Sequence, residues 1–301
     1  MFPMLYNIYT PTGCCKLFLH CVLFSLDHAA KLAYIGAYHK QFGSIAMKQL
    51  SKTELAVLAG KSVYHSLRVK SVLDGMAKTE RALKPSTNTK LGKRVTSGKL
   101  KGFPILTLTL EERATCPRSC AHWADCYGNN MMNATRYKAD AALIEQIEAD
   151  LLFYQAKYPQ GFLVRLHVLG DFFSVAYVAQ WAKWLGMFPA LHVYGYTANQ
   201  PDAADNKERN IGQAILSLRE ACGIRFAVRF SGSFTDSFSA LSNDDSRARD
   251  MLAEKQAFVC PTQISKETGK LAVKGEATLA ESCGACGACW QSKKPVVFIT
   301  H

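Results

Sequence analysis

Residues 162–198 of the chain read "FLVRLHVLGDFFSVAYVAQWAKWLGMFPALHVYGYTA". The first ten residues are mostly apolar and include two valines, which predicts a strand over 162–171. From 175 to 188 the apolar residues recur at helical spacing, and 191–198 again has the composition of a strand. Two strands joined by a helix are typical of parallel neighbours, because a parallel pair needs a crossover connection. This stretch therefore predicts an α/β fold.

The same alternation extends on both sides of this unit. Further strands are predicted over 103–110, 224–233, 257–263 and 295–301, and helices over 133–158, over 207–222 and near 244–255. Six strands separated mostly by helices predict a parallel sheet with helices outside, either a partial (β/α)6 barrel or an open, doubly wound sheet. In both arrangements the working face lies beyond the carboxyl ends of the strands.

The chain has an uneven excess of positive charge. Its 36 Lys and Arg against 24 Asp and Glu give a net charge of +12 in 301 residues. Residues 47–101 are basic and weakly helical, and 84–101 read as a loop without acidic residues. This segment is interpreted either as an arm that contacts the phosphates of a nucleic acid or nucleotide substrate, or as a solvated linker. The β/α domain, expected to bind metal, then spans 102–301.

The N-terminal residues 1–46 are interpreted either as an over-extended gene start, with Met47 as a natural beginning, or as a disordered N-terminus. They include "CCKLFLHCVLFSL", an apolar run that Lys16 and His20 interrupt. Such a run is too short and too broken to span a bilayer, and no clean cleavage site follows it. The chain is therefore expected to be cytoplasmic, without a membrane partner, and to keep its body thiols reduced or metallated.

Cysteines form two tight clusters. The first, Cys116, Cys120 and Cys126, has C-x3-C-x5-C spacing. Three thiolates leave one metal position open for an exchangeable ligand, whereas His122, or less readily Asp125, would make a closed zinc site.

The second cluster is the C-x2-C-x2-C run of Cys283, Cys286 and Cys289, with glycines between the thiols. Together with Cys260 it provides four thiolates, enough for a [4Fe–4S] cluster or an all-cysteine zinc site.

Polar residues gather at the ends of the predicted strands. The candidate catalytic residues are Asp171, Ser231 and His301, and the candidate cofactor-binding residues are Gly170, Asp171, Thr197 and Arg229. Arg229 alternates with Arg225 on one strand, as Arg165 does with His167 on another. Facing inward, these basic side chains would suit an anionic ligand; facing outward, they would be solvated. Trp181, Trp184 and Cys222 are expected in the core.

The motifs "NTKLGK", "CPRSCAHWADCYGNN", "HVLGDFFS", "YGYT", "RFSGS", "VCPTQ", "CGACGACW" and "VVFITH" resemble the phage- and plasmid-borne gene product 88 family, over about Asn88 to His301. This resemblance implies no particular activity. More distantly, the cysteine loop after the first strand resembles radical S-adenosylmethionine enzymes. That resemblance implies a [4Fe–4S] cluster on Cys116, Cys120 and Cys126, with Gly170 and Asp171 binding the methionyl amino group of S-adenosylmethionine. The cysteines of the second centre would then hold an auxiliary cluster.

Two functions follow as hypotheses. The first is an iron–sulfur enzyme, similar to radical S-adenosylmethionine proteins, with an open three-cysteine cluster and a second four-cysteine centre. The second is a zinc-stabilised nucleic-acid-binding protein without catalysis. The chain contains no Walker loop, G-x-S-x-G elbow or His-Glu-x-x-His, which argues against the common NTPase, hydrolase and zincin chemistries.

Overall fold

The computed structural model describes residues 50–74, 80–273 and 276–299. The predictions for residues 1–46 and for His301 therefore lie outside the described residues. Residues 50–301 form one compact unit. In the part of the chain that is described, no helix is long and apolar enough to cross a membrane.

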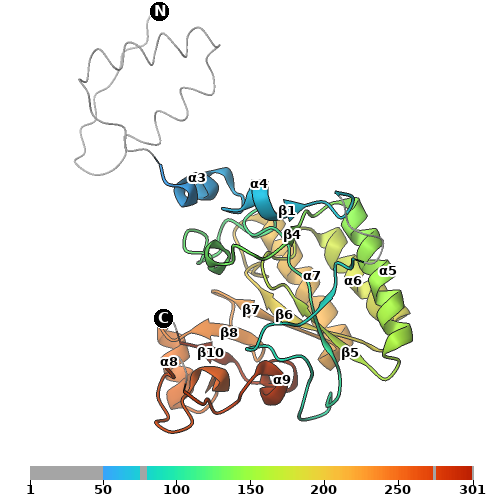
Figure 1. The fold of residues 1–301 in the computed structure, drawn as a ribbon. Coiled ribbons are helices and arrows are strands. Elements are labelled where there is room, and N and C mark those ends of the chain that lie inside the picture. The colour runs from blue at the N-terminus through green and yellow to red at the C-terminus, as the bar shows by residue number, and fades with distance from the viewer. Residues whose placement is uncertain (1–49, 75–79, 274–275, 300–301) are drawn as a thin grey trace, which may run out of the picture. The chain divides into compact units, whose positions relative to one another are not determined.

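The centre of the unit is an eight-stranded sheet in the order β2-β3-β5-β6-β7-β8-β10-β9 (Figure 1). Only β2 runs antiparallel to its neighbour. The strands are β2 (Lys84–Pro85), β3 (Ile105–Thr107), β5 (Phe162–Leu166), β6 (Leu191–Thr197), β7 (Phe226–Ser231), β8 (Ser239–Ser242), β9 (Phe258–Val259) and β10 (Val296–Phe298). From β3 to β8 the order follows the chain in one direction. The mixed α/β class with a mainly parallel sheet is thus confirmed.

Helices cover the sheet and connect its strands. They are α3 (Lys52–Ala59), α4 (His65–Arg68), α5 (Ala141–Lys157), α6 (Val175–Met187), α7 (Asn206–Cys222), α8 (Ser246–Ala253), α9 (Cys283–Cys286) and α10 (Ala288–Gln291). A small second sheet pairs β1 (Val69–Lys70) with β4 (Arg136–Tyr137). The 3-10 turns are η1 (Tyr127–Asn130), η2 (Gly223–Arg225) and η3 (Pro261–Gln263).

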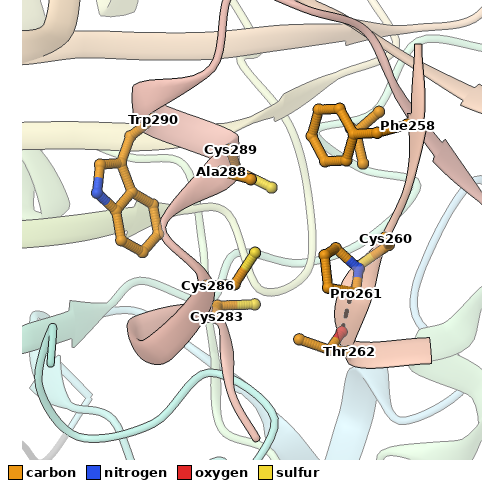
Figure 2. Close-up of a pocket in the computed structure, with 10 residues that line it drawn as sticks. Phe258, Cys260, Pro261, Thr262, Cys283, Cys286, Ala288, Cys289 and Trp290 are labelled. Atoms are coloured by element: carbon orange, nitrogen blue, oxygen red, sulfur yellow. Dashed lines mark hydrogen bonds between the residues drawn. The ribbon is translucent and has the colours of Figure 1, made fainter. Parts of the chain in front are cut away.

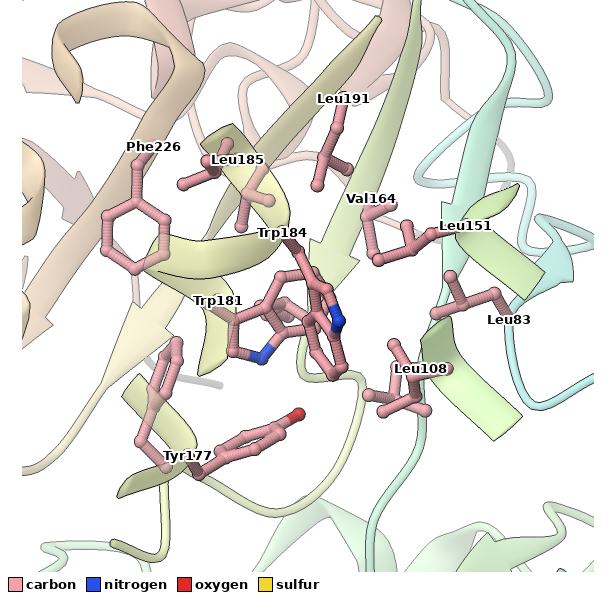
Figure 3. Packing of buried hydrophobic residues seen from close by; sticks show 14 of the residues in the cluster. Leu83, Leu108, Leu151, Val164, Tyr177, Trp181, Trp184, Leu185, Leu191 and Phe226 are labelled. Carbon is pink, nitrogen blue, oxygen red and sulfur yellow. The ribbon is translucent and has the colours of Figure 1, made fainter. Parts of the chain in front are cut away.

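Alternation along the strands separates two hydrophobic layers. One layer packs the sheet against α5, α6 and α7, and Trp181 and Trp184 of α6 are fully buried in it, as predicted (Figure 3). Their rings meet edge to face at 4.9 Å. Truncating such a buried aromatic ring typically costs about 3–5 kcal/mol. Cys222, at the end of α7, packs against the same layer.

The other face of the sheet carries Leu163, Tyr194 and Ala227, and the C-terminal cysteine segment covers it with Cys289 and Trp290. The basic segment 84–101 also packs here. Val95 and Leu100 are buried in this layer, and the amide of Thr96 donates to the carbonyl of Gly284. The exposed basic side chains of this segment are those of Lys90, Lys93, Arg94, Lys99 and Lys101.

Several predicted elements differ from the structure in their bounds. The helix predicted from residue 133 begins at Ala141, because Asp140 accepts a hydrogen bond from the amide of Leu143 and caps the helix there. Residues 136–137 form a short strand instead. The prediction also missed β8, a four-residue strand between β7 and α8, and it overextended the first strand, whose regular pairing covers only Ile105–Thr107.

Candidate functional site

Cys260 and the three cysteines of the second cluster line one cavity. Cys260 follows β9, while Cys283 and Cys286 belong to α9 and Cys289 to α10. Figure 2 shows the last three thiols pointing across the cavity toward the segment that carries Cys260. Cys260 and Cys289 are themselves buried. The structure therefore brings together the whole predicted four-cysteine set.

Local backbone chemistry curls this cysteine run. The Ser282 hydroxyl accepts a hydrogen bond from the Ala285 amide and starts α9. Gly287, with φ of +67°, ends that helix and begins α10, a conformation that favours glycine. At Gly284 a Cβ atom would lie 2.2 Å from the carbonyl oxygen of Arg94, so the backbone approaches the neighbouring segment too closely for a larger residue.

Burial opposes ionisation of these thiols. Burial, with smaller contributions from the neighbouring Cys289 and Cys260, raises the pKa of Cys283 to about 12. Burial also raises the pKa of Cys286 and of Cys289, although the Arg229 guanidinium acts in the opposite direction on Cys289. Without a cation, burial therefore keeps Cys283, Cys286 and Cys289 as neutral thiols. A bound metal would supply the positive charge that thiolates need, with release of protons.

The first cluster lies in the loop after β3, and buried ion pairs and hydrogen bonds brace this loop. Glu112 accepts hydrogen bonds from Ser62 and from Arg136, at 2.7 Å each. Arg136 also donates to the carbonyls of residues 128, 131 and 134. Arg113 donates to the carbonyls of residues 61, 123 and 124 and to the side chain of Asn129. No motif or periodicity in the sequence marks these bracing residues.

The three thiols of the first cluster lie close enough to one another to interact electrostatically. Burial, with a smaller contribution from the carboxylate of Asp171, raises the pKa of Cys116 well above its ordinary value and that of Cys120 to about 11. Burial likewise raises the pKa of Cys126. His122 lies 3.5 Å from Asp125 on the exposed side of the loop. The cluster thus sits beside Asp171, at the carboxyl end of β5.

No group of three or more His, Cys, Asp or Glu side chains, as they stand in the described residues, is arranged to hold a metal ion. All eight cysteines of this part of the chain are free thiols.

Asp171 connects the carboxyl ends of two neighbouring strands. Its carboxylate accepts hydrogen bonds from the amides of Phe172 and Ala198 and from the Thr197 hydroxyl, all at 2.7 Å. Burial nevertheless raises its pKa to about 6, because these donors only partly offset the loss of solvent. Ser231 extends this hydrogen-bond network, because its hydroxyl donates to the carbonyl of Thr197. The structure therefore brings Asp171, Thr197 and Ser231 together.

Gly170 holds the turn before Asp171 with φ of +81°, and a Cβ atom there would lie 2.5 Å from the Thr115 hydroxyl. The same hydroxyl accepts a hydrogen bond from the amide of Asp171 at 3.1 Å. Because Thr115 precedes Cys116, this contact fixes the first cysteine loop to the end of β5.

The basic strand residues have separate roles. Arg165 lies over the rings of Tyr194 and Tyr196 on the cysteine face, while His167 packs against Phe172 and Tyr177 on the helix face. The prediction that Arg165 and His167 share one face is therefore wrong, because regular strand alternation ends with β5 at Leu166.

Arg229 is fully buried and is committed to backbone acceptors. It donates to five carbonyls, those of Ser239, Ala288, Cys289, Ser292 and Lys294. Arg225 lies before β7 and donates to the carbonyls of Leu185, Phe188 and Leu191. Both guanidinium groups thus bind backbone, and Arg229 holds α10 against the sheet.

Together these features define an α/β protein with a mainly parallel sheet, a cysteine loop at its carboxyl edge and a four-cysteine centre on one face. The chain belongs to the Gene product 88 family, whose family model matches residues 79–292. It is similar to the Gene 88 protein of Mycobacterium phage D29, with 26% identity over 158 residues. The match covers 52% of this chain and 63% of that relative, less than two thirds of its length. No solved structure matches the chain.

Proposed function

We propose that this chain is an iron–sulfur metalloprotein whose main centre is held by Cys260, Cys283, Cys286 and Cys289. The observation that carries the proposal is the convergence of these four thiols on one cavity. Four thiolates are the usual ligand set of a [4Fe–4S] cluster and also of a closed zinc site, so the donor set fits either group. As they stand, the described side chains are not arranged to hold a metal ion, so binding would require them to rearrange.

We further propose an enzymatic role, similar to that of radical S-adenosylmethionine proteins, for the cysteine loop of Cys116, Cys120 and Cys126. Two observations favour it: the loop follows β3 at the carboxyl edge of the sheet, and Asp171 lies beside its thiols. The one-directional order from β3 to β8 also suits a partial barrel.

S-adenosylmethionine fits this site less well than a cluster does. The Asp171 carboxylate, which the resemblance assigns to its amino group, is 4% exposed and already accepts three hydrogen bonds from the protein. We therefore assign Asp171 a positioning role, holding the ends of β5 and β6 and the cysteine loop together. Any bound S-adenosylmethionine would supply radical chemistry from its sulfonium group.

Single cysteine substitutions test the division into two centres. After anaerobic purification of the full chain, Cys286→Ala is expected to remove the metal of the four-cysteine centre and to spare the other. Cys120→Ala is expected to do the reverse, and Cys222→Ala, outside both clusters, serves as the control. Metal analysis and absorption spectra report each loss. Simultaneous loss of all metal in both variants would show that the partition is wrong.

Zinc is the other outcome of the same metal analysis. A colourless protein with stoichiometric zinc would favour a zinc-stabilised nucleic-acid-binding protein, with the exposed lysines and arginines of segment 84–101 as its phosphate contacts. In that case binding to DNA or RNA should weaken steeply with salt, and no iron or sulfide would be found.

A further inference from the structure

Two tyrosines of β6 lie beside the four-cysteine centre. Tyr194 and Tyr196 are two residues apart on one strand, so both face the layer that α10 covers. The Tyr196 hydroxyl lies 2.9 Å from the Cys289 sulfur. The Tyr194 ring packs edge-on against Trp290, with the ring centroids 4.8 Å apart.

The Tyr194 hydroxyl is a buried polar group without a partner among the described residues. The residue is 1% exposed. Buried hydroxyls are nearly always hydrogen-bonded, so an orphan of this kind indicates an acceptor that the protein itself does not supply. Tyr194 belongs to the same buried cluster as Cys289 and Trp290, and Cys283 packs against that cluster.

Resting on the proposed function, we infer that the four-cysteine centre is a redox-active iron–sulfur cluster and that the Tyr194 and Tyr196 hydroxyls donate hydrogen bonds to its sulfur atoms. A zinc site offers only its four cysteine sulfurs as acceptors, whereas a cluster adds inorganic sulfides. Tyr196 already reaches a cysteine sulfur, and an inorganic sulfide is the acceptor suited to Tyr194.

Such hydrogen bonds raise the reduction potential. If a cluster is bound, its reduction by dithionite would add one electron, break no bond and leave both hydroxyl protons on the tyrosines. The two hydroxyl donors would stabilise the added negative charge on sulfur. They would therefore stabilise the reduced cluster more than the oxidised one. The guanidinium of Arg165 lies 5.5 Å from the ring centre of Tyr194 and 4.6 Å from that of Tyr196, and its charge acts in the same direction.

The test is the midpoint potential of this cluster in the full chain, measured by titration with dithionite and electron paramagnetic resonance. Tyr194→Phe and Tyr196→Phe remove only a hydroxyl, and both are expected to move the midpoint to more negative potential. Tyr177→Phe is the matched control, because it removes a buried hydroxyl on the helix face, where His167 is its partner. Its midpoint should equal that of the wild type.

A fluorinated tyrosine at position 194 gives a second variant that keeps the hydroxyl and its packing. Its stronger donor is expected to shift the midpoint in the positive direction. Unchanged midpoints in all the β6 variants would overturn this inference while leaving the metal centre in place. Zinc as the only metal on the four cysteines would overturn it too. If Cys286→Ala removes no metal from the wild-type content, the proposed function itself fails.

Discussion

His167 is a histidine that the fold keeps neutral. Its ring is 4% exposed, packs against Phe172 and lies 3.2 Å from the Tyr177 hydroxyl. Burial, with a smaller contribution from the Arg165 charge, lowers its pKa to about 3 from the ordinary 6.5. Between these two values the unfolded chain binds a proton that the folded chain does not. Stability from this residue is therefore present above pH 6.5 and is lost as the pH falls below it.

A His167→Gln variant should lack this acid sensitivity. Below pH 6.5 the free energy of unfolding of the wild type should fall relative to that of the variant by about 1.4 kcal/mol per pH unit. Asp171 acts in the opposite direction, because its pKa is raised to about 6 and stability falls as the pH rises toward that value. Both proteins keep Asp171, so its effect cancels in the difference. Urea unfolding of both proteins between pH 4 and pH 7 measures this difference in the free energy of unfolding. If the two free energies change with pH in the same way, His167 is not a buried neutral residue.

Burial of single residues was partly predictable from the sequence. Trp181 and Trp184 recur at helical spacing in an apolar segment, and both are buried as predicted. Pairing Arg165 with His167 failed, because alternation predicts a side chain's face only while the strand remains regular, and β5 ends between them. The orphan hydroxyl of Tyr194 has no sequence signal, since it depends on which segment covers β6.

Among the elements, α10 depends most on a single side chain. Its four residues are too few to be stable alone, and Arg229 of β7 donates to carbonyls at both ends of it. Arg229→Met leaves five backbone carbonyls, two of them in buried and three in partly buried hydrogen bonds, without this donor. We expect a loss of about 3 kcal/mol or more in the free energy of unfolding, together with loss of metal from the four-cysteine centre.

Arg225→Met is the matched control for this prediction, because Arg225 also donates to three carbonyls but far from the cysteines, at the end of α6. Its loss should lower stability and leave the metal content unchanged. Urea unfolding and metal analysis of both variants give the comparison. Full metal occupancy in Arg229→Met would show that α10 is held by other contacts.

Most elements were predicted where periodicity is strong. The elements predicted between residues 162 and 222 correspond to β5, α6, β6 and α7, although the first strand was predicted five residues too long. Errors arose where a few polar contacts decide the structure. The Asp140 cap delays the start of α5 by a full two turns, and β8 is too short to show a pattern. Such boundaries depend on side-chain hydrogen bonds that periodicity does not report.

At the scale of the whole molecule, the parallel sheet followed from the alternation of strands and helices, and its one-directional order came from the structure. Cys260 was assigned to the C-terminal cysteine run because a four-thiolate site needs a fourth ligand. In the structure, all four cysteines line one cavity. The sequence did not predict that this cavity lies against the face of β6 and β7, because that position depends on how residues 283–291 return across the sheet.

The central claim is that the four thiols on this face hold a metal cluster. The most direct measurement is the iron, zinc and acid-labile sulfide content per chain after anaerobic purification, for the wild type and for Cys286→Ala. We predict iron and sulfide in the wild type, with broad absorption near ~400 nm that dithionite bleaches, and loss of one cluster in the variant. A wild-type chain that contains neither iron nor zinc, and whose thiols all react with a thiol-specific reagent, would contradict the claim.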